Sequence, residues 1–183
     1  MKKAKRILSV LLALVMLIGI LPQQALAASD WAYVRWANGG VTNYGTFRAA
    51  WDAATSSGNN NTVGLLNNWD GGRFCVPEGK TVTLELNGFV LTRDRGSSTG
   101  DGEVLYVGKN AKLYVYGGTK ADPFKDYNGD PVNSKAHSVS VYVADGNRYG
   151  YSRRNETLYG GIINGGNSDN GGGGIHMKES ARV

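Results

Sequence analysis

The chain has 183 residues, of which 41% are apolar, and a formal net charge of +5. That length and apolar content suit one domain with a sizeable core. Four basic residues and no acid lie in the first 27 positions, so the rest of the chain carries sixteen basic against fifteen acidic residues. This near balance, with Arg153 and Arg154 as the one adjacent basic pair of the remainder, argues against nucleic acid as a partner.

The first 27 residues predict a secretory signal peptide. Basic residues at positions 2, 3, 5 and 6 form a positive n-region, ILSVLLALVMLIGIL forms an uncharged apolar core, and the segment ends on small residues. A membrane anchor needs about 20 apolar residues, and Pro22 interrupts this run. We therefore expect cleavage between Ala27 and Ala28, secretion or display at the cell surface, and no membrane contact apart from export. The lone Cys75 leaves no partner for an intrachain disulfide.

The first predicted element after the leader is a short amphipathic helix at about residues 46–57. Thr46 suits its N-cap position, and Gly58 suits its end. Four apolar residues recur at helical spacing and therefore share the face expected to pack on the core: Phe47, Ala50, Trp51 and Ala54. The stretch VGLL at residues 63–66 then predicts a buried strand.

From residue 74 onward the chain shows no helical period and instead repeats itself. Four stretches align at intervals of 31, 36 and 34 residues, beginning at Phe74, Leu105, Val141 and Ile175. Each has alternating apolar residues, a polar or glycine turn, and an apolar residue that enters a next strand. Short strands alternating with Gly-rich and Asn-rich turns at a fixed distance are typical of a coiled β-solenoid. The third stretch fits this pattern least well, since residues 148–150 suit a loop as well as they suit the start of a next strand.

These segments together resemble a known family. The leader, the helix, PEGKTVTLELNGFVLT, VLYVGKNAKLYVYGG and GGIINGG resemble the N-terminal part of bacterial right-handed parallel β-helix proteins of the pectate-lyase-like superfamily. More narrowly, they resemble the large surface proteins of Gram-positive gut bacteria. The resemblance covers residues 44–183 and implies an all-β fold, a right-handed parallel β-helix or solenoid whose first coil is capped by the amphipathic helix.

The expected organisation has three parts. Residues 1–27 form the signal peptide, residues 28–61 an N-terminal segment with the capping helix, and residues 62–183 the first coils. The last stretch aligns with the second, so Val183 takes the place of Leu113, the first inward residue of a strand. Because natural solenoids normally cap such an edge, we expect the chain to be a fragment and further coils to follow it.

The repeat alignment also predicts which tyrosines face outward. If the first residue of each stretch points inward, the next points outward, because strand residues alternate. Tyr106 and Tyr142 then share one outward row, and Tyr114 and Tyr116 lie on the following strand. Exposed tyrosines can stack on sugar rings, so these four are candidates for a glycan-binding strip. A polysaccharide or a host or cell-wall glycan is the expected partner, unless other segments cover these tyrosines or they stack on one another.

The candidate catalytic motifs are incomplete. The loop TRDRGSSTGDGE at residues 92–103 brings Asp94, Asp101 and Glu103 together with Arg93 and Arg95. The resemblance implies that such acids could hold calcium and such bases could abstract a proton, as in polysaccharide lyases, but a solvated loop explains the residues equally. Glycosidases need two carboxyl groups about 5–9.5 Å apart, and the sequence places no pair at that separation.

Calcium is the one cofactor for which the sequence offers a motif. DYNGD at residues 126–130 begins like a calcium loop, yet Pro131 and His137 stand where an EF-hand needs glycine and a bidentate acid. A turn is therefore favoured. Neither His137 nor His176 has a cysteine or an acidic cluster at ligand spacing, so we expect no bound metal.

Together these features favour a secreted or cell-surface module of a Gram-positive bacterium, structural, adhesive or glycan-binding and without a complete catalytic site. The alternative is the N-terminal part of a carbohydrate-active enzyme, a polysaccharide lyase or glycoside hydrolase, whose active site lies in later coils. The module is preferred because no group of residues in the chain satisfies a catalytic mechanism.

Overall fold

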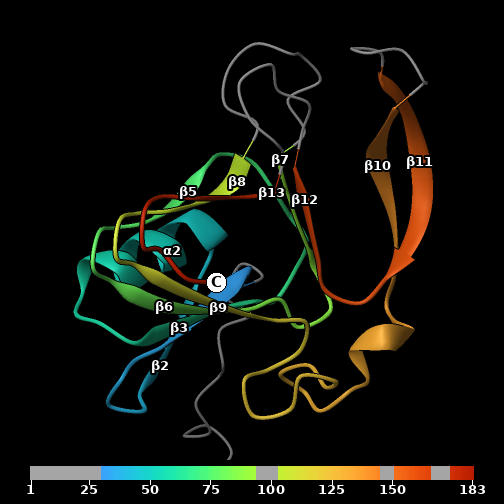
Figure 1. Cartoon of the computed structure of the whole chain (residues 1–183). Coiled ribbons are helices and arrows are strands. Elements are labelled where there is room, and N and C mark those ends of the chain that lie inside the picture. Colours follow the sequence, from blue (N-terminus) through green and yellow to red (C-terminus); the bar gives the residue numbers. More distant parts are fainter. Residues whose placement is uncertain (1–29, 94–102, 145–150, 166–173) are drawn as a thin grey trace, which may run out of the picture.

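The computed structural model describes residues 30–93, 103–144, 151–165 and 174–183 (Figure 1). The predicted signal peptide, with its cleavage site between Ala27 and Ala28, lies outside these residues. Within them the chain forms four separate β-sheets, one α-helix and one 3-10 helix. No helix among the described residues combines the length and the apolar character needed to span a membrane.

The largest sheet has five strands in the order β2-β1-β3-β6-β9. Strand β1 is antiparallel to both of its neighbours, whereas β3, β6 and β9 run parallel to one another, so the sheet is mixed. The strands are β1 (Ala32–Arg35), β2 (Val41–Tyr44), β3 (Asn61–Leu65), β6 (Thr81–Glu85) and β9 (Lys112–Tyr116).

Two further sheets are parallel and have three strands each. One has the order β12-β7-β4, with β12 (Ile162–Gly165), β7 (Val90–Arg93) and β4 (Trp69–Asp70). The other has the order β13-β8-β5, with β13 (Gly174–Met177), β8 (Glu103–Val107) and β5 (Phe74–Val76). The fourth sheet is an antiparallel hairpin of β10 (Ala136–Ala144) and β11 (Tyr151–Tyr159), preceded by the 3-10 helix η1 (Val132–Ser134). In Figure 1 this hairpin stands to one side of the other sheets.

The helix α2 (Phe47–Ser56) forms where its spacing and caps predict. The hydroxyl of Thr46 accepts a hydrogen bond from the backbone N–H of Ala49 at 3.1 Å, which satisfies one of the free donors at the helix start. The four residues of its predicted apolar face are all buried, with exposed fractions between 0% and 2%. They pack on the inward side chains of the sheets. A helix this short needs such tertiary contacts to be stable.

The core lies between this helix and the inward faces of the largest sheet and of the two parallel sheets. Phe47 meets the ring of Phe74 edge-on at 4.7 Å, and the ring of Trp51 lies 5.7 Å from Phe74. Leu84, Leu91, Leu105 and Leu113 contribute one fully buried side chain from each of four strands. The inward side chains of the strands therefore supply the core, and on β5 and β9 they alternate with exposed residues such as Cys75 and Tyr114, as the period-two pattern predicts.

The expectation of a right-handed parallel β-helix is wrong. The described strands form four separate short sheets, one of them mixed and one wholly antiparallel, together with a helix. The stretch from Val141 departs most clearly, because it lies in β10 and Val141 pairs with Arg154 of the antiparallel strand β11. Apolar alternation is common to parallel and antiparallel strands, so the pattern identified strands without identifying their partners.

The pairing register of the other three aligned stretches is confirmed. Phe74 pairs with Leu105, and Leu105 pairs with Ile175, in the parallel sheet β13-β8-β5. Phe74 and Leu105 are fully buried and Ile175 is half-buried, as expected for inward positions. The next residues, Cys75 and His176, are exposed.

Candidate ligand-binding cleft

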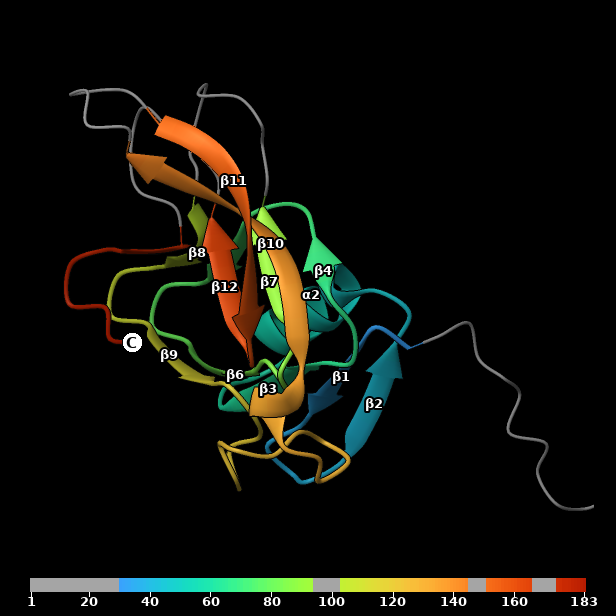
Figure 2. The same ribbon diagram turned by 90° about the vertical axis from the view of Figure 1, so that its right-hand side faces the viewer.

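A cleft of about 240 Å³ lies between the sheet β12-β7-β4 and the first half of β10. In Figure 2, β10 lies in front of β7 and beside β12, which agrees with the residues on its two walls. The described residues that line it are Asn68, Trp69, Asp70, Val90, Thr92, Ser138, Val139 and Asn164. They come from chain segments up to about one hundred residues apart, so the fold creates the cleft.

A row of three polar side chains crosses the sheet wall of the cleft. Asn164 pairs with Thr92, and Thr92 pairs with Asp70, so an amide, a hydroxyl and a carboxylate lie on neighbouring strands. Neighbouring strands are about 4.8 Å apart, so the row spans about 10 Å. The amide nitrogen of Asn164 donates to the hydroxyl of Thr92 at 3.4 Å. The row offers hydrogen-bond donors and acceptors to a ligand.

The inward neighbours of this row hold it in place. Leu91 is fully buried, and Ile163 packs against the core, so the alternate residues Thr92 and Asn164 face away from it. Trp69 also turns toward the core, where its ring lies 5.9 Å from Trp31, edge to face. The Trp69 ring therefore anchors the strand that carries Asp70.

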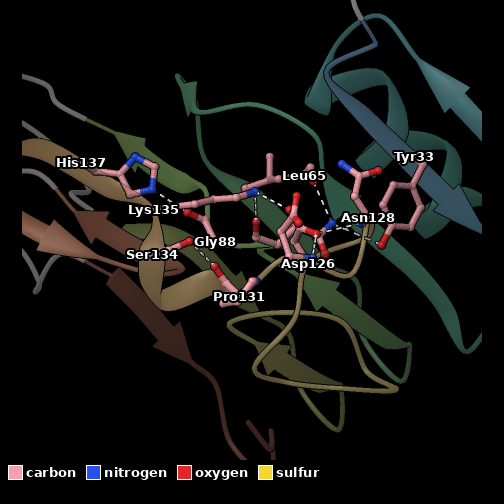
Figure 3. A network of polar contacts seen from close by, with 11 residues as sticks. Tyr33, Leu65, Gly88, Asp126, Asn128, Pro131, Ser134, Lys135 and His137 are labelled. Atoms are coloured by element: carbon pink, nitrogen blue, oxygen red, sulfur yellow. Dashed lines mark hydrogen bonds and ion pairs between the residues drawn. The ribbon is translucent and has the colours of Figure 1, made fainter.

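The opposite wall is anchored at the base of the hairpin, as Figure 3 shows. The ammonium of Lys135 donates to the carbonyl of Asn87 at 3.0 Å and lies 4.0 Å from the centre of the Phe89 ring. The Nε2 of His137 lies 2.5 Å from the carbonyl oxygen of Gly88, which makes this nitrogen the donor. These contacts fix where β10 starts relative to the turn between β6 and β7.

Asn68 connects the two walls. Its Oδ1 accepts from the backbone N–H of Val90 at 2.9 Å, which orients the side-chain amide. Its Nδ2 then points toward Nδ1 of His137, 3.5 Å away. The cleft is thus lined by side chains with ordered polar contacts, which favours a formed binding site over a gap between loops.

The segment DYNGD, which begins like a calcium loop, is a turn held by Asp126. The Oδ1 atom of Asp126 accepts from the backbone N–H groups of Asn128 at 2.8 Å and Asp130 at 2.9 Å (Figure 3). Its Oδ2 atom accepts from the ammonium of Lys135 at 2.7 Å. A lysine therefore occupies the side of the carboxylate where a cation would bind. No group of three or more metal-ligating side chains occurs among residues that the structure describes.

Burial alone would raise the pKa of the Asp126 carboxyl, but Lys135 and the two backbone donors outweigh it and hold that pKa below its usual value. A carboxylate with a lowered pKa stabilises the fold at pH values above the usual aspartate pKa. This stabilisation is lost as the pH falls through the lowered pKa.

We expect Asp126→Asn to be less stable than the native chain at pH 7, by roughly 1–3 kcal/mol. The difference should shrink below about pH 4. Urea unfolding at pH 7 and pH 3 measures it, and an equal difference at both would contradict the role of the charge.

The four candidate tyrosines do not form one strip. Tyr106 lies on β8 between Cys75 and His176, whereas Tyr142 lies on β10 and pairs with Arg153. Tyr114 is 47% exposed on β9, and Tyr116, on the same strand, is half-buried. The prediction of a shared row with Tyr142 is wrong because the hairpin β10–β11 replaces the parallel strand that the alignment assumed.

Tyr106 is one of the described residues that line a second hollow, of about 360 Å³. The guanidinium of Arg73 lies 5.1 Å from the Tyr106 ring centre, and the His176 ring lies 5.4 Å from it. Burial raises the pKa of the nearby Cys75 thiol above its usual value, and the positive charge of Arg73 only partly offsets this. The thiol is therefore not activated, and the faces of the tyrosine are already engaged by neighbours.

The acidic loop is described only at its two ends, since Asp94, Arg95 and Asp101 lie outside the described residues. Arg93 is buried and donates to the backbone carbonyl of Glu103 at 2.7 Å. The carboxylate of Glu103 pairs with Arg73 at 2.8 Å. Burial would raise the pKa of Glu103, but its backbone hydrogen bond and Arg73 lower it overall. Arg93 therefore ties β7 to β8, and the carboxylate of Glu103 ties β8 to the segment just before β5.

Reasoning from the sequence missed the cleft itself. Asp70 and Asn164 lie in the polar stretches NNWDGG and NGG, whose composition is typical of turns, and Thr92 begins the stretch TRDRGSSTGDGE, whose composition is typical of a loop. A second sequence alignment could have found them. It aligns residues 69–70 with 91–92 and 163–164, each pair lying on the strand before one of the stretches that begin at Phe74, Leu105 and Ile175.

No protein family, curated protein or solved structure compared with this chain matches it. The resemblance to pectate-lyase-like proteins therefore stays a prediction.

Proposed function

We propose that this protein is a non-catalytic, glycan-binding module exported to the bacterial surface or beyond it, and that it binds glycans through the cleft. The observation that carries the proposal is the row of Asp70, Thr92 and Asn164 inside a cleft. Carboxylate, hydroxyl and amide groups side by side can both accept from and donate to the hydroxyls of a sugar. Two small apolar side chains, Val90 and Val139, line the same space and suit the C–H surface of a sugar ring.

Export is part of the proposal and is supported by the first 27 residues. Their basic start, apolar core and small residues at Ala25–Ala27 have the pattern of a cleaved secretory leader. An exported protein with a sugar-binding cleft can meet a polysaccharide, a cell-wall glycan or a host glycan. A Gram-positive source remains the expectation from the sequence pattern.

Binding is favoured over catalysis by the composition of the cleft. Hydrolysis of a glycosidic bond needs two carboxyl groups on opposite sides of the scissile bond. Asp70 is the only carboxylate among the described residues that line the cleft. A lyase needs a base beside a neutralised uronate carboxylate, and the described lining residues include neither lysine nor arginine. The enzyme alternative would place the reaction outside this cleft.

The function is tested by measuring glycan binding of the exported protein and of cleft variants. We expect Thr92→Val to weaken binding about tenfold, because one lost hydrogen bond of roughly 1.4 kcal/mol changes an affinity by that factor. Valine keeps the shape of threonine but cannot accept from Asn164 or from a ligand. Affinity electrophoresis in gels containing neutral or acidic polysaccharides, followed by calorimetry, measures the change.

The matched control is Asp52→Asn, which removes a carboxylate from the exposed face of α2, where its side chain is 63% exposed. It should bind as the native protein does. If Thr92→Val and the native protein bind the glycan with equal affinity, the binding site does not lie in the cleft. The absence of binding to every glycan offered would refute the proposed function.

A further inference from the structure

We infer that a row of side chains at the β9 edge of the five-stranded sheet binds an anionic group of a glycan, a carboxylate, sulfate or phosphate. The row consists of Thr81, Lys112 and Arg182, and Tyr114 lies beside it on the same face. The inference rests on the proposed function for the class of ligand, a glycan. It adds a second surface, separate from the cleft and with a different chemistry.

Strand pairing places two cations side by side in this row. Thr81 pairs with Lys112, and Lys112 pairs with Arg182 in a parallel bridge. The backbone N–H of Arg182 donates to the carbonyl of Ala111 at 3.0 Å, and the N–H of Leu113 donates to the carbonyl of Arg182 at 2.9 Å. Figure 1 and Figure 2 both show the C-terminal end of the chain beside β9. Paired residues point to the same face from backbones about 4.8 Å apart, so the ammonium and the guanidinium can contact one ligand.

The inward neighbours of the two cations show that the row faces solvent. Ala111 and Leu113 are fully buried on either side of Lys112, which is exposed. Ala181 packs against the core just before Arg182, which is exposed as well. Side chains alternate along an extended chain, so both cations project from the outer face of the sheet, where a ligand can reach them.

The positive charge of the row is not neutralised within the described part of the chain. Lys112 and Arg182 form no ion pair with any described residue. Glu179, three residues before Arg182, contacts Lys109 instead, at 3.7 Å. Glu85 of β6 lies on the same face, but it is fully buried and already accepts three hydrogen bonds. Like charges on directly paired residues destabilise a sheet, so an anion bound between the two cations would relieve their repulsion.

The chemistry of the row suits an oxyanion attached to a sugar. Ammonium and guanidinium groups donate charge-assisted hydrogen bonds to carboxylate, sulfate and phosphate oxygens, and the Thr81 hydroxyl adds a further donor. Tyr114 follows Lys112 by two residues on β9, is 47% exposed, and makes no ring contact with another described residue. Its ring is therefore open to stacking on the sugar that carries the anionic group.

A glycan is favoured over nucleic acid or an anionic membrane because the positive charge is local. Nucleic acids and anionic membranes are dense arrays of negative charge, and proteins bind them through many lysines and arginines. After the predicted leader the chain has sixteen basic and fifteen acidic residues, and this row supplies only two adjacent cations. One anionic substituent on a sugar matches two cations beside an exposed tyrosine.

The experiment compares three polysaccharides that share one backbone: dextran, carboxymethyl dextran and dextran sulfate. Binding of the exported protein is measured by affinity electrophoresis and calorimetry at low and at high salt. We expect both anionic polymers to bind at least about tenfold more tightly than dextran at low salt, and this difference to shrink as salt is added. Lys112→Gln and Arg182→Gln should each weaken binding of the anionic polymers about tenfold and leave binding of neutral glycans unchanged.

The matched control is Lys125→Gln, which removes the same charge from a lysine that is 57% exposed and pairs with Asp122 at 3.8 Å. It should bind all three polymers as the native protein does. Urea unfolding separates a binding role from a structural one, because relief of the repulsion should leave the midpoint of Lys112→Gln equal to or above the native midpoint. A lower midpoint would contradict the repulsion on which the inference depends.

The outcomes separate this site from the cleft. If the anionic polymers bind no more tightly than dextran, or bind the double variant Lys112→Gln/Arg182→Gln as well as the native protein, the inference is wrong while the cleft stands. If Thr92→Val binds every glycan normally and Lys112→Gln does not, the cleft is removed and this site stands. Duplex DNA or phosphatidylglycerol vesicles bound as tightly as dextran sulfate through the same two residues would overturn the glycan as the ligand class. No binding of any polysaccharide would remove both sites.

Discussion

Replacing Glu85 with alanine is expected to lower the free energy of unfolding by about 3–5 kcal/mol, as loss of one partner from a buried charge network does. The Glu85 side chain is fully buried. Its carboxylate accepts from the hydroxyl of Tyr33, from the guanidinium of Arg35 at 3.2 Å, and from the backbone N–H of Lys120 at 2.5 Å. Alanine would leave three donors without this acceptor and would open a cavity.

The sequence of β3 makes this network possible. Tyr33 of β1 and Glu85 of β6 sit on either side of Gly64 in β3. A side chain at position 64 would meet the Tyr33 ring at 2.1 Å, so only glycine lets that ring lie across the strand toward Glu85. Burial raises the pKa of the Tyr33 hydroxyl well above its usual range, which keeps it protonated and able to donate.

Urea unfolding measures the effect of Glu85→Ala, since a neutral denaturant does not screen the ion pair with Arg35. Glu85→Gln, which keeps an acceptor oxygen, should lose less stability than Glu85→Ala. Glu179→Ala is the control, because the Glu179 side chain is 80% exposed and its pair with Lys109 is long, at 3.7 Å. If Glu85→Ala and Glu179→Ala unfold at the same urea concentration, the buried network does not stabilise the fold.

Replacing Trp51 with alanine is expected to cost about 3–5 kcal/mol, the usual range for removing a large aromatic side chain from a core. Trp51 is 1% exposed and packs between the rings of Phe47 and Phe74, each 5.7 Å away. Its indole N–H also donates to the backbone carbonyl of Cys75 at 2.9 Å, which joins α2 to β5. The variant would lose both the packing and this hydrogen bond.

The matched control is Asp52→Ala, the next residue on the exposed side of the same helix. Alanine is the best helix former, so this change should leave stability within about 0.5 kcal/mol of the native value. Circular dichroism at 222 nm during urea unfolding follows both variants. A loss below about 1 kcal/mol for Trp51→Ala would mean that the helix is not a main support of the core.

The helix and the inward positions of several strands were determined by the sequence alone. The spacing of Phe47, Ala50, Trp51 and Ala54 defines one helix face whatever the helix packs against, and Thr46 caps the start through a contact three residues away. Alternation likewise placed Phe74 and Leu105 in the core. These features depend on residues close together in the chain, so local geometry is enough to predict them.

Strand partners, the cleft and the buried charge were decided by the tertiary structure. Val141 alternates like Leu105, yet it pairs with an antiparallel strand, because alternation carries no information about the partner. Glu85 occupies what the pattern marks as an outward position and is buried, because Tyr33 reaches it across Gly64 and Lys120 covers it. Asp70, Thr92 and Asn164 become one row only when three strands pair in register. Each of these features requires contacts between residues that are distant in the chain. The free energy of such contacts comes from packing and desolvation. A local sequence pattern carries no information about either.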